Sequence, residues 1–110
     1  MKSESEPIVV LMTAASGAEA TRIAEELVHQ KLAACVQILP EVQSIYVWKG
    51  DVQREREVLI IAKSTRANFE RLERRVRELH SYDTPEVIAL PVIAGSDRYL
   101  DWLFNSCEAS

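Results

Sequence analysis

The stretch that decides the arrangement of this chain is His80-Ser81-Tyr82-Asp83-Thr84-Pro85-Glu86-Val87-Ile88-Ala89-Leu90. Asp83 and Thr84 favour a turn through local side-chain hydrogen bonds, and Pro85 fixes its own φ angle while restricting Thr84 to extended backbone. The apolar run that starts at Val87 then predicts a strand. We therefore expect a helix that ends near His80, a sharp turn, and a strand over Val87–Val92.

Outward from this stretch, the apolar pattern alternates between strand and helix signals. A capping box formed by Ser16 and Glu19 predicts one helix start, and Pro40 predicts a bulge within a long strand. The expected elements are a strand over Ile8–Met12, a helix from Ser16 to about Lys31, a strand from about Ala33 to Trp48, a turn at Lys49–Asp51, a strand from Val52 to Ala62, a helix from Thr65 to Leu79, the strand at Val87, and a short helix capped by Ser96.

This order, β-α-β-β-α-β plus a C-terminal helix, predicts an α+β fold of the ferredoxin-like, split βαβ type, with an antiparallel sheet in the order 4-1-3-2. A chain of 110 residues is the size of one domain. We expect that domain to span residues 8–107, after a disordered tail over residues 1–7.

The composition excludes several classes of protein. A net charge of −4 argues against a nucleic-acid partner, because phosphate binding needs a basic face. No apolar run approaches the roughly 20 residues of a membrane-spanning helix, and no signal peptide is visible. Cys35 and Cys107 form no metal-type pair, so we expect free thiols and a cytoplasmic location. We expect Cys35 to be buried in its strand and Cys107 to be accessible near the C-terminus.

The apolar pattern of the strands also indicates whether the chain associates with other copies of itself. The first, third and fourth strands are apolar at consecutive positions, so both sheet faces require burial, whereas two crossover helices cover only one face. Association with other copies would cover the second face, with Tyr46 and Trp48 on the projecting hairpin as interface residues. The alternative is a monomer in which the final helix covers the second face.

The topology sorts the polar residues into two groups at opposite ends of the sheet. Pairing of Trp48 with Asp51 would place Cys35 near Ser64, far from His80, which argues against a Cys-His catalytic pair within one chain. No phosphate-binding loop and no hydrolytic triad is present, so we do not expect an enzyme. A metal site is an open alternative, with His80 and Glu86 or Asp83 as nitrogen and oxygen ligands and Met12 as a thioether ligand suited to copper.

Several motifs together resemble the CutA divalent-cation tolerance family, over about residues 8–104. They are Lys31-Leu-Ala-Ala-Cys-Val36, Ser44-Ile-Tyr-Val-Trp-Lys-Gly50, the run from Glu57 to Lys63, His80-Ser-Tyr-Asp-Thr-Pro-Glu86 with Val87-Ile-Ala-Leu-Pro91, and Tyr99-Leu-Asp-Trp102.

The resemblance implies a ferredoxin-like subunit in a tight homotrimer similar to the PII signalling proteins, with Tyr46, Trp48 and Trp102 at the trimer interface. It also implies a role in tolerance of divalent metals, copper especially. The polar set shared by the family corresponds here to an intersubunit cleft formed by Cys35, Glu57, Lys63, His80, Tyr82 and Glu86.

Some positions depart from the family pattern. Ser81 stands where proline is common, and Gln37 stands where asparagine is usual. Met12 and Leu79 stand where copper-binding members can carry cysteine and histidine. Of that set only His80 is kept, with Met12 as a weaker soft ligand in place of cysteine, so we expect copper or another divalent cation to bind weakly, through His80 rather than Cys35.

Three functions follow as alternatives. The first is a trimeric, cytoplasmic protein of metal-ion response that binds a divalent cation. The second is a PII-like signalling module that binds a small anionic ligand in the intersubunit cleft, with Lys63 as the cation. The third is a trimeric interaction scaffold without catalysis.

Overall fold

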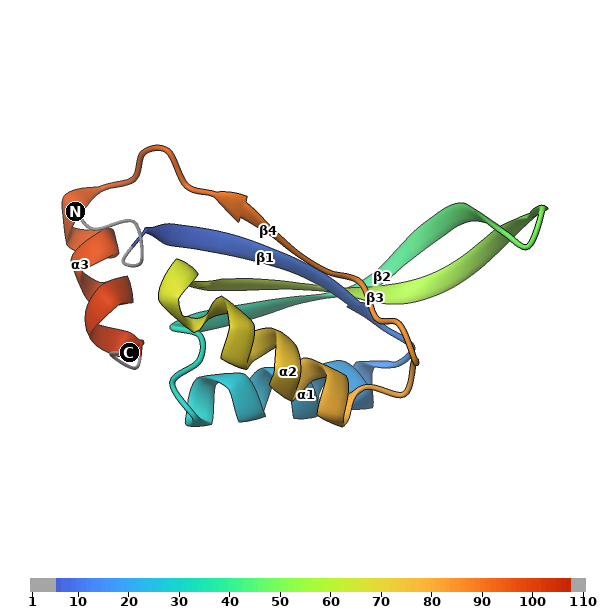
Figure 1. The fold of residues 1–110 in the computed structure, drawn as a ribbon, viewed down its shortest axis with the longest axis horizontal. Helices are drawn as coiled ribbons and strands as arrows, with labels where there is room; N and C mark the ends of the chain where they lie inside the picture. The colour runs from blue at the N-terminus through green and yellow to red at the C-terminus, as the bar shows by residue number, and fades with distance from the viewer. Residues whose placement is uncertain (1–5, 108–110) are drawn as a thin grey trace.

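A computed structural model of the chain describes residues 6–107, so residues 1–5 of the expected tail over residues 1–7 lie outside this range, and Pro7 of that tail is the first residue of β1. Its elements are β1 (Pro7–Ala14), α1 (Gly17–His29), β2 (Cys35–Trp48), β3 (Asp51–Thr65), a 3₁₀ turn η2 (Arg66–Asn68), α2 (Phe69–Leu79), β4 (Val87–Pro91) and α3 (Asp97–Ser106). The strands form one antiparallel sheet in the order β2-β3-β1-β4 (Figure 1). The predicted fold class and strand order are confirmed.

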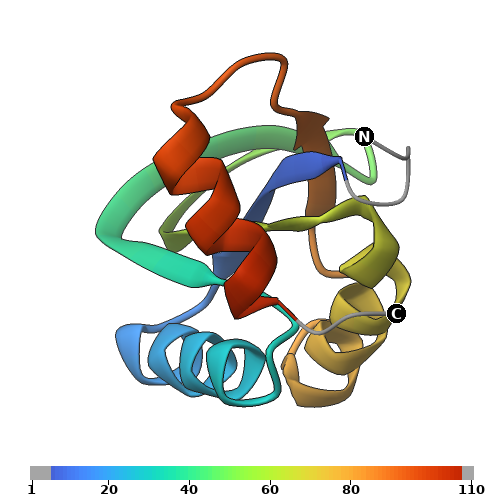
Figure 2. The ribbon, with the colours of Figure 1, turned by 90° about the vertical axis from the view of Figure 1, so that its left-hand side faces the viewer.

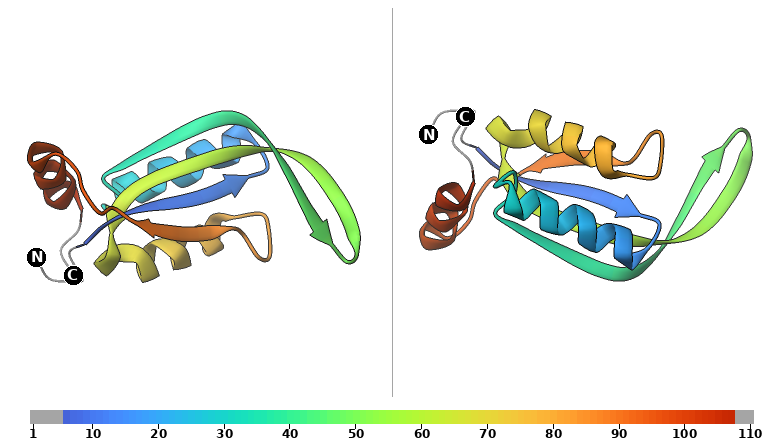
Figure 3. Two further views of the ribbon diagram at one scale, coloured as in Figure 1. Left: turned by 90° about the horizontal axis from the view of Figure 1, so that it is seen from above. Right: turned by 90° about the horizontal axis from the view of Figure 1, so that it is seen from below.

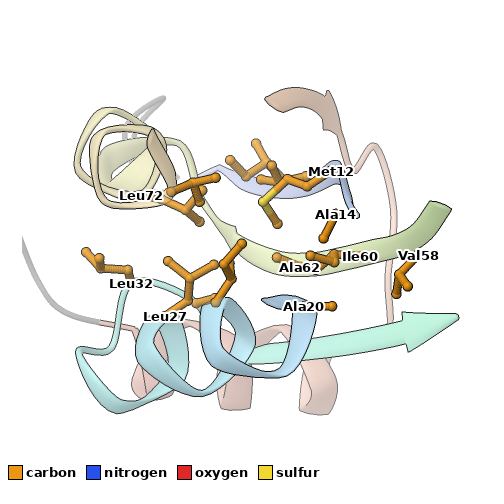
Figure 4. Packing of buried hydrophobic residues seen from close by; sticks show 14 residues of the cluster. Met12, Ala14, Ala20, Leu27, Leu32, Val58, Ile60, Ala62 and Leu72 are labelled. Atoms are coloured by element: carbon orange, nitrogen blue, oxygen red, sulfur yellow. The ribbon is translucent and has the colours of Figure 1, made fainter. Parts of the chain in front are cut away.

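Helices α1 and α2 lie side by side on one face of the sheet (Figure 3). Along β1, Ile8, Val10 and Met12 point toward these helices and are buried, whereas the residues between them are half-buried on the other face. The helices contribute Leu27 from α1 and Leu72 from α2 to the same core (Figure 4). This period-two pattern fixes which side chains of each strand remain on the open face.

The ends of α1 follow from local chemistry. Ser16 is the N-cap, and its hydroxyl accepts a hydrogen bond from the Glu19 N–H at 3.2 Å. The helix ends at His29, two residues before the expected end, because Lys31 adopts a left-handed conformation with φ 60°. The Leu32 N–H then bonds the Leu27 carbonyl at 2.9 Å, as in a Schellman motif.

The β2–β3 hairpin closes through a two-residue turn. Lys49 (φ 51°) and Gly50 (φ 85°) both have positive φ, as in a type I′ turn, and Trp48 pairs with Asp51 as predicted. A register shift between Leu39 and Val42 confirms the bulge expected at Pro40.

The bulge also changes a pairing that the turn alone predicts. It inserts one extra residue into β2, so Cys35 lies opposite Lys63 rather than Ser64. Cys35 therefore lies near Ser64, as expected, but its direct partner across the strands is Lys63.

No helix or strand of residues 6–107 covers the second face of the sheet (Figure 3). Its side chains, here called the open face, are Cys35, Gln37 and Leu39 of β2, Glu57, Leu59, Ile61 and Lys63 of β3, Val9, Leu11 and Thr13 of β1, and Ile88 and Leu90 of β4. Helix α3 lies across the end of the sheet and not over this face (Figure 2). The outer half of the β2–β3 hairpin, here called the arm, extends beyond the helices and accounts for the longest of the 44 × 26 × 22 Å dimensions.

Neither cysteine has the exposure that was predicted. Cys107 is buried at the end of α3, where its thiol contacts Ser64, Asn68 and the backbone of Ala34, and burial raises the pKa of this thiol. Cys35 is only half-buried, because its side chain lies on the open face. The prediction failed because the docking of α3 against the sheet is a long-range contact.

Candidate functional site

His80 lies where α2 ends, beside the last residues of β1. Its Nε2 is 2.7 Å from the carbonyl oxygen of Thr13, and its Nδ1 accepts a hydrogen bond from the Tyr82 N–H at 3.0 Å. Because Nδ1 accepts, the ring proton is on Nε2 and donates to Thr13. Both ring nitrogens of a neutral imidazole are therefore engaged with the backbone.

Tyr82 connects this imidazole to a buried carboxylate. Its hydroxyl donates to Glu57 Oε2 at 3.0 Å, and its ring stands 4.6 Å from the His80 ring, measured between centroids. Burial, and next the carboxylate of Glu57, raise the pKa of Tyr82 to about 12. The phenol is therefore protonated at neutral pH and acts as a hydrogen-bond donor to Glu57.

Glu19 belongs to the same cluster, although sequence reasoning assigned it only to a capping box. Its Oε1 accepts from the Ala15 N–H at 3.0 Å and its Oε2 accepts from the Ser81 N–H at 2.8 Å. Burial alone would raise the pKa of Glu19, but these hydrogen bonds outweigh it and leave the pKa lowered. The capping box was the one sequence signal for this residue; the bond to Ser81 depends on the tertiary fold.

A second polar group lies near the other end of the sheet, on the open face. Cys35 is paired across the strands with Lys63, whose ammonium donates to Gln37 Oε1 at 2.5 Å. Lys63 pairs with Val9 of β1, four residues from Thr13, which separates the two groups by roughly 13 Å along the strand. The six predicted cleft residues thus form a cluster of Glu57, His80 and Tyr82, a separate pair of Cys35 and Lys63, and the exposed Glu86 before β4.

The predicted metal ligands are not brought together in one chain. Met12 pairs with Val87 at this end of the sheet, but its side chain is fully buried beneath the helices (Figure 4), so its sulfur is in the core. Residues 6–107 contain no group of three or more His, Cys, Asp or Glu side chains that could hold a metal ion. His80 could ligate a cation only by giving up one of its two hydrogen bonds.

The predicted interface aromatics are all exposed in the isolated chain. Tyr46 and Trp48 lie on the arm, and Trp48 is 60% exposed. Trp102 of α3 is 46% exposed, and its ring is tilted by 42° against that of Tyr99, with 5.5 Å between the ring centroids. No helix within residues 6–107 is long and apolar enough to cross a membrane.

Together, the fold and this end-of-sheet cluster define a ferredoxin-like protein with a covered helical face and an open sheet face. A model of the family described as CutA1 divalent ion tolerance protein matches residues 8–106. The chain belongs to this family, as the motifs predicted.

Relatives support the same assignment. The chain is 47% identical over 95 residues to the divalent-cation tolerance protein CutA of Thermus thermophilus, which covers 86% of this chain and 92% of that protein. It is 46% identical over 99 residues to a chloroplastic CutA protein of Arabidopsis thaliana, covering 90% of this chain but 54% of that longer protein. The chain thus spans about half the length of the plant relative.

Solved structures agree with the fold. The crystal structure of CutA1 from Oryza sativa superposes with a TM-score of 0.94 at 40% identity, covering 99% of this chain and 100% of that one. A periplasmic divalent cation tolerance protein CutA from Archaeoglobus fulgidus gives a TM-score of 0.90 at 35% identity, covering 93% of this chain and 99% of that one.

Proposed function

We propose that this protein is a homotrimer that acts in the response to divalent metal ions. The observation that carries the proposal is the open face, whose apolar centre has no covering element among residues 6–107. Exposed apolar surface of this extent is typical of an interface between subunits. The arm gives each copy a means of reaching a neighbour, with Tyr46, Trp48 and Trp102 as contact residues.

We expect the metal ion to bind at the end of the sheet, beside the cluster of Glu57, His80 and Tyr82. In a trimer, polar groups at the edge of one open face would line a cleft against the next subunit. His80 would supply the nitrogen donor, and carboxylates such as Glu57 and Glu86 would supply oxygen donors for copper or another divalent cation. Met12 is not a ligand in this arrangement, because its sulfur is in the core. Since ligation costs His80 a hydrogen bond, we expect weak binding.

Calorimetric titration with Cu²⁺ tests the metal function. Binding should be lost in His80→Ala and should persist in His29→Ala, a matched control on the exposed end of α1. No binding to the wild type, or binding that survives His80→Ala, would contradict the assignment. Light scattering tests the assembly, and a stable monomeric mass at micromolar concentration would overturn the trimer.

A second candidate is a PII-like module that binds a small anion in the intersubunit cleft. The pairing of Lys63 with Cys35 on the open face favours it, because an ammonium group there could meet an anionic ligand. Ligands that bind only the folded trimer raise its melting temperature. A thermal-shift response that disappears in Lys63→Ala would favour this function over a scaffold that binds no ligand.

We further propose that the protein works in the cytoplasm and without a catalytic step. Two free cysteines are typical of a reducing compartment, although the names of relatives place one in the chloroplast and one in the periplasm. Cell fractionation with a tagged chain tests the location.

A further inference from the structure

The arm leaves the sheet at one point, which we call the base of the arm. Strand β1 ends at Ala14, which pairs with Val58 of β3. The bulge of β2 lies between Leu39 and Val42, so that Val42 and Glu57 are the first pair beyond it. From there a two-stranded ribbon continues past the ends of β1 and β4 (Figure 3). Because a bulge bends the strand that carries it, the direction of the arm can change at this base.

A side chain from outside the hairpin binds at the base of the arm. The hydroxyl of Tyr82, in the turn between α2 and β4, donates to Glu57 Oε2 at 3.0 Å. Of the hydrogen bonds found within residues 6–107, it is the one that joins the arm to an element other than β2 and β3. Glu57 is buried, so water competes little for this bond.

Tyr82 is itself fixed to the end of β1. Its N–H donates to Nδ1 of His80 at 3.0 Å, and Nε2 of His80 lies 2.7 Å from the carbonyl oxygen of Thr13. The N–H of Ser81 is held at 2.8 Å by the buried carboxylate of Glu19. A continuous set of hydrogen bonds therefore connects the last residues of β1 to the first residue of β3 in the arm.

The length of the arm makes its direction sensitive to this connection. Strand β2 runs from Val42 to Trp48 in the arm, a span of roughly 20 Å at the usual rise of an extended strand. A small change of angle at the base therefore moves Trp48 by several times the displacement at Glu57. A hydrogen bond restricts both distance and angle, so the bond from Tyr82 to Glu57 limits this movement where it begins.

We propose that Tyr82 is a positioning residue for the arm, and that its hydrogen bond to Glu57 sets the direction in which the arm leaves the sheet. In a trimer, that direction decides whether Tyr46 and Trp48 meet the neighbouring copy, and this second part rests on the proposed function. Tyr82→Phe keeps the ring beside His80 but removes the bond, so the arm swings more freely about the bulge. The direction of the arm within one copy does not depend on the trimer, so the two parts are tested separately.

Double electron–electron resonance measures the direction of the arm. One spin label is attached at Asp51→Cys in the arm and the other at Glu70→Cys on α2, two exposed positions, with both native cysteines replaced by serine. Dilution with unlabelled chain restricts the measurement to distances within one copy. We expect a narrow distance distribution for this parent protein and one at least twice as wide in Tyr82→Phe. Tyr99→Phe, which removes an exposed hydroxyl from α3, is the matched control and should leave the distribution unchanged.

Analytical ultracentrifugation of the unlabelled variants measures assembly. The dissociation constant of the trimer should rise roughly tenfold in Tyr82→Phe, an effect of the size of one lost hydrogen bond, and should not change in Tyr99→Phe. Circular dichroism confirms that each variant is folded.

An unchanged distance distribution in Tyr82→Phe overturns the role of Tyr82, whatever the state of assembly. A wider distribution with unchanged assembly overturns the link between the direction of the arm and the trimer. A monomeric wild type overturns the trimer itself, and the distance measurement then still decides the role of Tyr82.

Discussion

The carboxylate of Glu19 accepts a hydrogen bond at 2.8 Å from the backbone N–H of Ser81, a residue 62 positions further along the chain. The same side chain accepts from Ala15 at 3.0 Å, so one buried carboxylate joins the start of α1 to the turn after α2. This turn carries His80 and Tyr82. The positions of His80 and Tyr82 therefore depend on Glu19, although the Glu19 side chain itself is buried.

Glu19→Gln should destabilise the fold by about 1–3 kcal/mol at neutral pH, because the amide can accept at only one of the two positions and leaves an N–H unsatisfied. Urea denaturation measures the change. Glu25→Gln on the exposed side of α1 is the control and should shift stability by less than about 0.5 kcal/mol.

The pH dependence of this effect has a defined sign. The folded-state pKa of Glu19 is lowered, so its contribution is fully present above the unfolded-state value near 4.3 and is lost as pH falls through the folded-state value. The difference in stability between wild type and Glu19→Gln should therefore narrow in acid. A constant difference from pH 7 to pH 3 would show that the carboxylate is not the stabilising form.

Tyr82→Phe removes the donor to Glu57 and should cost about 1–2 kcal/mol, because it leaves a buried carboxylate oxygen without that partner. The pKa of Tyr82 is raised to about 12, so its contribution is complete below the unfolded-state pKa near 10 and is lost as pH rises toward 12. Ultraviolet absorbance of tyrosinate during alkaline titration measures the pKa of Tyr82. A wild-type titration with no phase near pH 12, or with that phase unchanged in Tyr82→Phe, would contradict the hydrogen bond.

Cys107 should react slowly with a thiol reagent in the folded protein, because its thiol is buried and burial raises its pKa. In Cys35→Ser, which leaves Cys107 as the remaining thiol, we expect labelling at least tenfold slower than in denaturant. Equal rates would mean that the end of α3 does not pack as described. The Cys107→Ser variant reports Cys35 separately and shows whether assembly protects the open face.

The fold could be predicted because it depends on local patterns. Continuous apolar runs marked the strands, Ser16 and Ser96 marked two helix starts, and the turn at Lys49 and Gly50 set the pairing of the arm. Pro40 indicated the bulge, and the bulge shifts by one position the pairs that lie on its far side from the turn, so Cys35, expected near Ser64, lies directly opposite Lys63.

The site could be predicted only in part, for a physical reason. Topology alone brings His80 to the end of β1. The orientation of a side chain, however, depends on the face it occupies, and alternation along β1 directs Met12 into the core. The bond from Ser81 to Glu19 and the burial of Cys107 depend on how elements distant in sequence pack against each other. The pattern of residues within one segment does not predict such packing.

Lys31 offers a test of the backbone that needs no ligand. Its φ of 60° lies in the left-handed region at the C-terminal end of α1, where most helices that end in this way carry glycine because a Cβ atom is unfavourable there. Lys31→Gly should therefore stabilise the protein by up to about 1 kcal/mol, measured by urea denaturation. Lys31→Ala removes the same charge but keeps the Cβ, so it should give no such gain. If alanine and glycine stabilise equally, the effect comes from the lost charge, and the left-handed conformation at this position carries no strain.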